Sequence, residues 1–193
     1  MSAVGYDEYT YYMLRGVPDG AGGYTLDASE KDLERDFDGL RYKSFGPVGG
    51  YGDKKGVYSE SYAEEDGDDV YMSSDVVRSS LEYKLELYFF CPDDSLTEYA
   101  ARVNAAREVY EAFMDYVSGG MVVWWDTVRQ RRVLMYLEEG VEPDDDVVCG
   151  EPYLGVELKF KGVFGRSFPL DDTTIAEYFG LSESNDLWGV LVG

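Results

Sequence analysis

Hydrophobic and polar residues alternate most regularly between residues 81 and 162, and this stretch predicts the centre of the fold. Residues 81–87 place an apolar side chain at every second position, which is typical of a strand with one buried face. Residues 153–161 repeat that period. Residues 121–125 are apolar, β-branched or aromatic throughout and predict a buried strand, and residues 129–137 predict its returning partner.

Between these strands the apolar residues change to helical spacing. They fall at positions 96, 99, 100, 103, 106, 110, 113, 114 and 117, which predicts one amphipathic helix over residues 95–118. Ser95 and Glu98 form an S-x-x-E pattern, in which each side chain can accept a hydrogen bond from a backbone N–H at the helix start. Gly119 and Gly120 predict a left-handed end to the helix.

Together these elements predict an α+β fold, mainly β, in which the long helix packs on an antiparallel β-sandwich or barrel. Residues 1–40, rich in Gly and Tyr, predict an N-terminal arm or hairpin, and residues 41–170 predict the core. Residues 171–193 predict a short helix, capped by Asp172 and ended by Gly180, and then an apolar tail that should be buried. Further short elements are predicted as strands at 6–15, 24–26, 57–62 and 70–72, a helix at 29–37 and an acidic loop at 141–150.

The charge of the chain is strongly one-sided. Its 193 residues hold 17 Lys and Arg against 39 Asp and Glu and no His, so the formal net charge is −22 at pH 7. Binding to a phosphate backbone requires clustered cations, and Arg129, Arg131 and Arg132 are the one such cluster in the sequence. We therefore expect no direct binding to nucleic acid and none to anionic membranes. The 18 Tyr residues suit strands and wet interfaces.

Candidate chemistry is sparse. Acidic clusters at residues 64–69, 93–94 and 144–146 offer oxygen ligands, but none follows the EF-hand calcium-loop pattern, so no metal and no cofactor is predicted. Without His, the sequence lacks the common Ser-His and Cys-His pairs for nucleophilic catalysis, and we expect no enzyme. Cys91 and Cys149 are expected to be free thiols in a cytoplasm, because no signal peptide or transmembrane run is visible.

Three features are candidates for contacts with other subunits. Adjacent Trp residues in a strand face opposite sides, so one faces the core and the other faces the helix or a subunit contact. The three clustered Arg residues are expected on a wet face, where they can meet an acidic patch of an identical neighbour. The apolar tail can pack in its own domain or on a neighbour. The candidate assembly contacts are Trp124, Trp125, Arg129, Arg131, Arg132, Leu187 and Trp188.

The order of these elements resembles the helix-bearing β-sandwich of bacteriophage tail-tube-type proteins, most of all the hub domain of distal tail proteins. The matching segments are Tyr83 to Phe90, Tyr99 to Val117, Met121 to Asp126, Arg131 to Leu137 and Glu151 to Phe160. The resemblance implies a structural subunit of a phage or prophage tail that forms a ring, typically a hexamer, with itself and contacts other tail proteins. It also implies manufacture in the host bacterial cytoplasm and a place in the virion tail.

The resemblance makes the charge intelligible, since an acidic lumen would repel DNA that passes through the ring. Other interpretations remain open. A carbohydrate- or protein-binding β-sandwich would need Trp124 or Trp125 exposed in a groove. A head-to-tail completion protein would form a ring in a similar way. An enzyme using two carboxylates would need a convergent pair of acids in a deep pocket.

Overall fold

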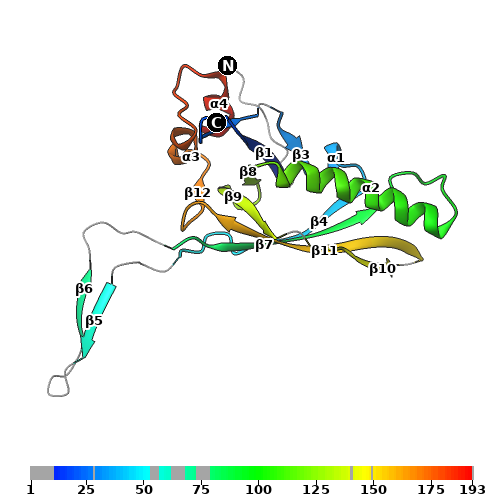
Figure 1. Ribbon diagram of the computed structural model, residues 1–193, viewed down its shortest axis with the longest axis horizontal. Helices are drawn as coiled ribbons and strands as arrows, with labels where there is room; N and C mark the ends of the chain where they lie inside the picture. The colour runs from blue at the N-terminus through cyan, green and yellow to red at the C-terminus, as the bar shows by residue number, and fades with distance from the viewer. Residues whose placement is uncertain are drawn as a thin grey trace.

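The computed structural model describes residues 11–27, 29–52, 57–61, 68–72, 79–139, 141–148 and 150–192. The fold is α+β and mainly β (Figure 1). The main sheet is antiparallel and consists of β1 (Tyr11–Pro18), β2 (Tyr24–Leu26), β3 (Lys31–Asp32), β4 (Leu40–Gly46), β7 (Glu82–Phe90), β8 (Met121–Asp126), β9 (Arg131–Glu139), β10 (Asp144–Val148), β11 (Glu151–Gly162) and β12 (Phe168–Pro169). A two-stranded sheet consists of β5 (Val57–Ser61) and β6 (Asp68–Met72). The helices are α1 (Leu33–Asp36), α2 (Tyr99–Ser118), α3 (Thr174–Tyr178) and α4 (Asp186–Val192).

The strands predicted around the long helix are confirmed as neighbours in the main sheet. The hydrogen-bonded order is β2-β1-β8-β9-β11-β7-β4, with β10 added to β11, β12 to β9 and β3 to β1. The chain before residue 40 contributes the hairpin β1–β2, and β1 pairs with β8 along six residues inside the sheet. None of the helices in the described ranges has the length and apolarity needed to cross a bilayer.

The helix α2 covers the inner face of the sheet and completes the main core. Alternate residues of β7 are buried against it, namely Tyr83, Leu85, Leu87 and Phe89. The helix buries Ala106, Phe113, Tyr116 and Val117 on its facing side, as the apolar stripe predicts. Burial of this area is the main favourable contribution to folding.

Aromatic side chains close the sheet where backbone pairing stops. The strands β1 and β4 lie far apart in the strand order, but the rings of Tyr11 and Tyr42 stack with centroids 3.9 Å apart. The ring centroid of Trp124 in β8 lies 4.7 Å from that of Phe45 in β4 and 5.4 Å from that of Tyr11. The short helix α1 contacts both β1 and β4. The sheet is therefore rolled, and its two sides meet through these rings.

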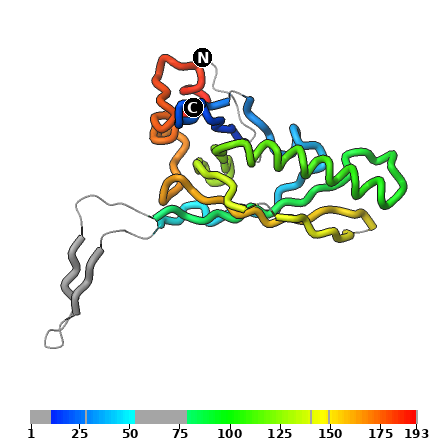
Figure 2. The backbone as a smooth tube through the Cα atoms, in the orientation of Figure 1, coloured from blue at the N-terminus to red at the C-terminus, as the bar shows by residue number. Residues whose placement is uncertain are grey.

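A second apolar cluster lies on the opposite face of β1, β8 and β9. The C-terminal segment packs there, with Ile175 and Ala176 of α3 and Leu191 of α4 buried against Trp125 and Leu134. Figure 2 shows the red C-terminal segment beside the blue strand β1. The segment expected as an apolar tail forms the helix α4 and packs on its own chain, with Leu191 buried and Trp188, Val190 and Val192 partly buried.

The long helix begins four residues later than predicted. The carboxylate of Asp93 accepts a hydrogen bond from the backbone N–H of Ser95, and the carbonyl of Asp93 accepts one from Leu96. These bonds hold the residues before the helix in a turn, so Glu98 becomes the N-cap and makes no side-chain capping bond. The predicted Ser95–Glu98 capping box is therefore wrong.

The helix end is also different from the prediction. Gly119 has a φ of −73°, in the right-handed region, so the expected left-handed stop is absent from these two glycines. Gly120 is required for another reason. A Cβ atom there would lie 2.1 Å from the backbone oxygen of Gly16, because the chain enters β8 in close contact with β1.

The strands β4 and β10 of the main sheet were not predicted. The strand β4 was missed because a bulge between Tyr42 and Ser44 breaks the alternation that sequence analysis depends on. The acidic segment expected as a loop contains β10, which pairs with β11 through its backbone and exposes all five of its side chains. The predicted helix at 29–37 shortens to α1, where Asp32 accepts hydrogen bonds from the N–H groups of Glu34 and Arg35.

We predict that Gly120→Ala lowers the free energy of unfolding by about 1–3 kcal/mol, because the new methyl group must displace the backbone of β1. Chemical denaturation measures this change. Gly189→Ala is the matched control, since nothing lies within 4 Å of a Cβ atom at that helical position. The control should leave stability unchanged or raise it by up to about 1 kcal/mol. Equal effects of the two substitutions would contradict the close approach of β8 and β1.

We further predict that Trp124→Ala lowers the free energy of unfolding by about 3–5 kcal/mol, because it removes the ring that links β8 to β4 and leaves a cavity. Tyr99→Ala is the control, since this ring is 56% exposed at the start of α2 and its removal should cost under about 1 kcal/mol. Denaturation curves of both variants measure the difference. A loss for Trp124→Ala no larger than that of the control would show that the rings do not hold the rolled sheet together.

Candidate interaction surfaces

The structure places both predicted Trp contacts inside the chain. Trp124 and Trp125 point to opposite faces of β8, as predicted, with exposed fractions of 0% and 2%. Trp124 belongs to the cluster under α2, and Trp125 belongs to the cluster under the C-terminal helices. A groove that exposes either Trp for sugar stacking is therefore not formed.

Arg132 is buried, so the expectation of a wet face is wrong for this member of the basic trio. Its guanidinium lies 4.6 Å from the centroid of the Trp125 ring, and the residue is 2% exposed. It donates hydrogen bonds to the carbonyl of Leu170 at 2.6 Å and to that of Val190 at 3.3 Å. The side chain therefore fastens the segment around α3 and α4 to β9.

The other candidate contacts keep accessible surface. Arg129 forms an ion pair with the buried Asp126 at 2.6 Å, while about half of its side chain stays exposed. Arg131 at the start of β9 and Leu187 and Trp188 of α4 are half-buried. Trp188 also packs against the second apolar cluster. The assembly role of these residues stays a prediction.

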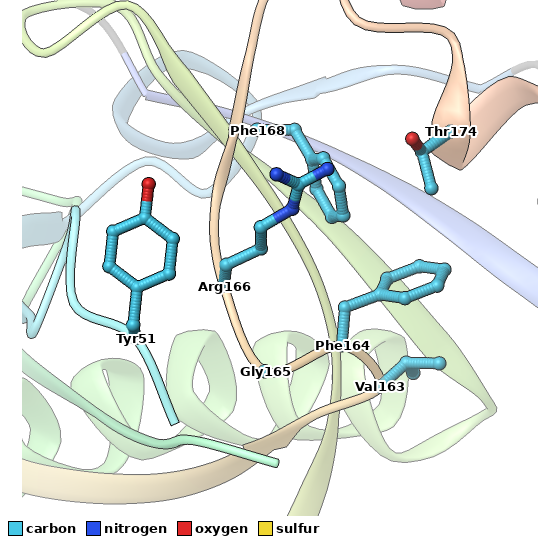
Figure 3. A pocket seen from close by; sticks show the side chains of 7 residues that line it. All are labelled: Tyr51, Val163, Phe164, Gly165, Arg166, Phe168 and Thr174. Carbon is cyan, nitrogen blue, oxygen red and sulfur yellow. The ribbon is translucent and has the colours of Figure 1, made fainter. Parts of the chain in front are cut away.

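An aromatic groove lies where the chain leaves β11, and sequence analysis did not find it. It has a volume of about 590 Å³ and is lined by Tyr51, Val163, Phe164, Gly165, Arg166, Phe168 and Thr174 (Figure 3). Three contacts hold the loop after β4 along this segment. Tyr51 and Arg166 form an antiparallel bridge, Gly52 N–H donates to the Gly165 carbonyl, and Gly49 N–H donates to the Ser167 hydroxyl. We call this site the Arg166 groove.

The Arg166 groove combines one cation with aromatic surface. The guanidinium of Arg166 lies 4.8 Å from the ring of Phe168, and no carboxylate among the described residues forms an ion pair with it. The Phe164 ring contacts Phe168 and Tyr178 edge-on, and Tyr51 is 59% exposed. Such a groove suits an anionic group beside an apolar side chain. No motif in the sequence marks it, because its residues come from two distant loops.

The edge strand β10 is the second exposed surface. It pairs with β11 on one side, and no described strand pairs with its other side. Asp145 and Val147 share one face of the strand, while Asp144 and Asp146 share the other. Val147 and Val148 are 48% and 45% exposed. An open edge with exposed apolar side chains is a ready surface for another chain.

The outer face of β4, β7 and β11 carries interleaved charges. Ion pairs join Lys43 to Glu86 at 2.6 Å, Lys84 to Glu157 at 2.9 Å and Lys161 to Glu138 at 3.5 Å. Hydrogen bonds from Lys43 and Ser44 hold the pKa of Glu86 below its usual range. A shallow hollow of about 280 Å³ lies on this face beside β10. Exposed pairs of this kind contribute little to stability and keep the face solvated.

The acidic clusters do not build a metal centre in the part of the chain that the structure describes. There, no three His, Cys, Asp or Glu side chains come together as a metal ion requires. The cluster at residues 64–69 lies largely outside the described residues. Cys91 is a free, buried thiol, and Cys149 lies outside the described residues. The predicted free thiol of Cys91 is therefore confirmed.

Comparison with known proteins gave a structural likeness and no sequence match. No protein-family model and no curated protein matches the sequence. The fold is similar to the crystal structure of the SPP1 Dit (gp 19.1) protein, described as a paradigm of the hub adsorption apparatus in phages that infect Gram-positive bacteria. The TM-score is 0.48 and the sequence identity is 14%, over 82% of this chain and 52% of the Dit chain. This chain thus spans about half the length of the protein that it matches.

We predict that Arg132→Met loosens the C-terminal segment, because it removes the charged donor to the Leu170 and Val190 carbonyls. Hydrogen bonds from charged groups contribute about 1.5–3 kcal/mol each. Hydrogen exchange should therefore become faster in α3 and α4, by about tenfold or more, while the amides of β7 stay protected. Arg131→Met is the control and should change little. Unchanged exchange in α4 would show that Arg132 does not fasten it.

Proposed function

We propose that the chain is a non-enzymatic structural subunit of a phage or prophage tail, either of the distal tail hub or of the tail tube, and that it builds a ring. The observation that carries this proposal is the pair of exposed contact surfaces, the Arg166 groove and the edge strand β10, on one self-contained domain. Figure 1 places β10 toward one end of the sheet and β12, which lies beside the Arg166 groove, toward the other end.

A single strand connects the two surfaces. The first half of β11 pairs with β10, and the groove begins at Val163, directly after the strand ends. At about 3.3 Å per residue, the two surfaces are roughly 30 Å apart along a rigid strand. Contacts between two different patches of identical subunits are heterologous, and they close into a ring when the rotation between subunits permits. This arrangement supports a ring subunit.

The charge of the chain fits passage of DNA without binding. A net charge of −22 repels phosphate, and the repulsion acts over about a Debye length of roughly 10 Å at moderate salt. A ring of such subunits gives DNA a channel to which it does not adhere. The partners in this proposal are identical copies and other tail proteins, and the subunit is made in the bacterial cytoplasm before it joins the virion tail.

One observation favours a second candidate function. The Arg166 groove has the size and the aromatic lining of a peptide site, so a protein-binding module that holds a foreign acidic segment is the alternative. In that case the groove would bind a partner that is not a copy of the chain, and no ring would be needed.

Antibody labelling of phage particles tests the proposal. We predict that antibodies raised against the purified chain label tails of particles released from the producing bacterium, as seen by electron microscopy. Label at the tail tip would identify a hub protein, and label exposed along broken tails would identify a tube protein. Particles from a strain that lacks the gene serve as the control. Absence of the chain from purified particles, checked by mass spectrometry, would refute the tail function.

A further inference from the structure

We infer that the edge strand β10 of one copy docks on the Arg166 groove of the next copy, with Asp145 facing Arg166 and Val147 against the aromatic wall. This inference rests on the proposed ring function and names its contact. Both surfaces are present in every copy, so each subunit can use its groove for one neighbour and its β10 for the other.

The side chains of β10 present the chemistry that the groove accepts. Side chains alternate along a strand, so Asp145 and Val147 stand on the same face about 7 Å apart. Asp144 and Asp146 turn to the outer face, where Asp146 accepts a hydrogen bond from the Tyr153 hydroxyl. Within the described part of the chain, Asp145 forms an ion pair with Arg107 alone, at 3.9 Å, and half of its side chain stays exposed. A carboxylate and an apolar side chain are thus free to contact another surface.

The groove presents the complementary groups. Figure 3 shows the Arg166 side chain extending toward the Phe168 ring and away from Tyr51. Stacking on Phe168 at 4.8 Å limits the movement of the guanidinium and leaves its N–H donors available for a carboxylate. Tyr51 and Phe164 offer apolar surface on either side of this cation. Contact with Val147 would cover part of this surface.

Charge complementarity favours an acidic segment of this same chain as the occupant. The chain holds 39 acidic residues against 17 basic ones, and its net charge of −22 makes copies repel one another at long range. A stable contact between copies must therefore match one of the few cations with a carboxylate. Arg166 is such a cation, and β10 offers a carboxylate on an open strand edge with exposed valines. The long-range repulsion also predicts that the contact strengthens with added salt.

Charge reversal tests this contact by sedimentation velocity over a concentration series, at low and moderate salt. Arg166→Glu and Asp145→Lys should each weaken self-association by at least about tenfold, because each places like charges opposite one another. The chain that carries both substitutions restores an opposite-charge pair and should recover to within about threefold of the wild type. Tyr51→Ala should weaken association as well, since it removes apolar surface from the groove.

Matched controls separate this contact from a general effect of charge. Lys159→Glu changes the net charge by the same amount as Arg166→Glu, and Asp94→Lys matches Asp145→Lys, at exposed positions outside both surfaces. Neither control should produce the loss or the recovery. Thermal unfolding of every variant checks that the fold is kept, which we expect because all the substituted side chains are exposed.

The outcomes distinguish this inference from the proposed function. Loss in both single variants with recovery in the double variant supports the contact. A wild type that associates while the single variants behave like their controls refutes the contact and leaves the ring function standing. A wild type that stays monomeric at all concentrations also refutes the contact as a self-association site, and antibody labelling of particles then decides the tail function by itself.

Discussion

The stacked rings of Tyr11, Tyr42 and Trp124 close the rolled sheet between β1 and β4, which are not joined by backbone hydrogen bonds. The strands β1 and β4 belong to distant parts of the strand order, and their contact is made by rings. This closure places α2 over the inner face and seals the main core around it. Because the core depends on side-chain contacts at this junction, a change of ring size there affects the whole sheet, while backbone pairing holds the other strands in register.

The second link in the structure is the buried Arg132 against Trp125. It ties the C-terminal helices to the outer face of β8 and β9, so apolar surface that would otherwise be exposed is covered by the chain itself. Charge burial of this kind requires satisfied hydrogen bonds, and the carbonyls of Leu170 and Val190 provide them. The C-terminal helices thereby cover the second apolar cluster. The edge strand β10 and the Arg166 groove stay exposed toward opposite ends of the sheet.

The relation between charge and assembly follows from this arrangement. A strongly acidic chain stays soluble and repels polyanions, but it must also tolerate repulsion between its own copies. Pairing of Lys and Glu across the outer face keeps that face locally balanced. In the contact that we infer between copies, the acidic edge β10 supplies the carboxylate, and the Arg166 groove supplies a cation that forms no ion pair with the described residues.

The sequence by itself determined the fold class, the long helix and the strands around it. Period-two and helical spacing of apolar residues indicate which side chains face a core, and both can be recognised in the sequence without knowing which strand is the partner. Tertiary structure alone decided the rest. Neither the burial of Arg132 nor the position of β1 inside the sheet has a local signature, because both depend on strand pairing between distant segments. The same is true of β10, which is a strand because its backbone pairs with that of β11. It is also true of the Arg166 groove, whose walls come from loops more than a hundred residues apart in the sequence.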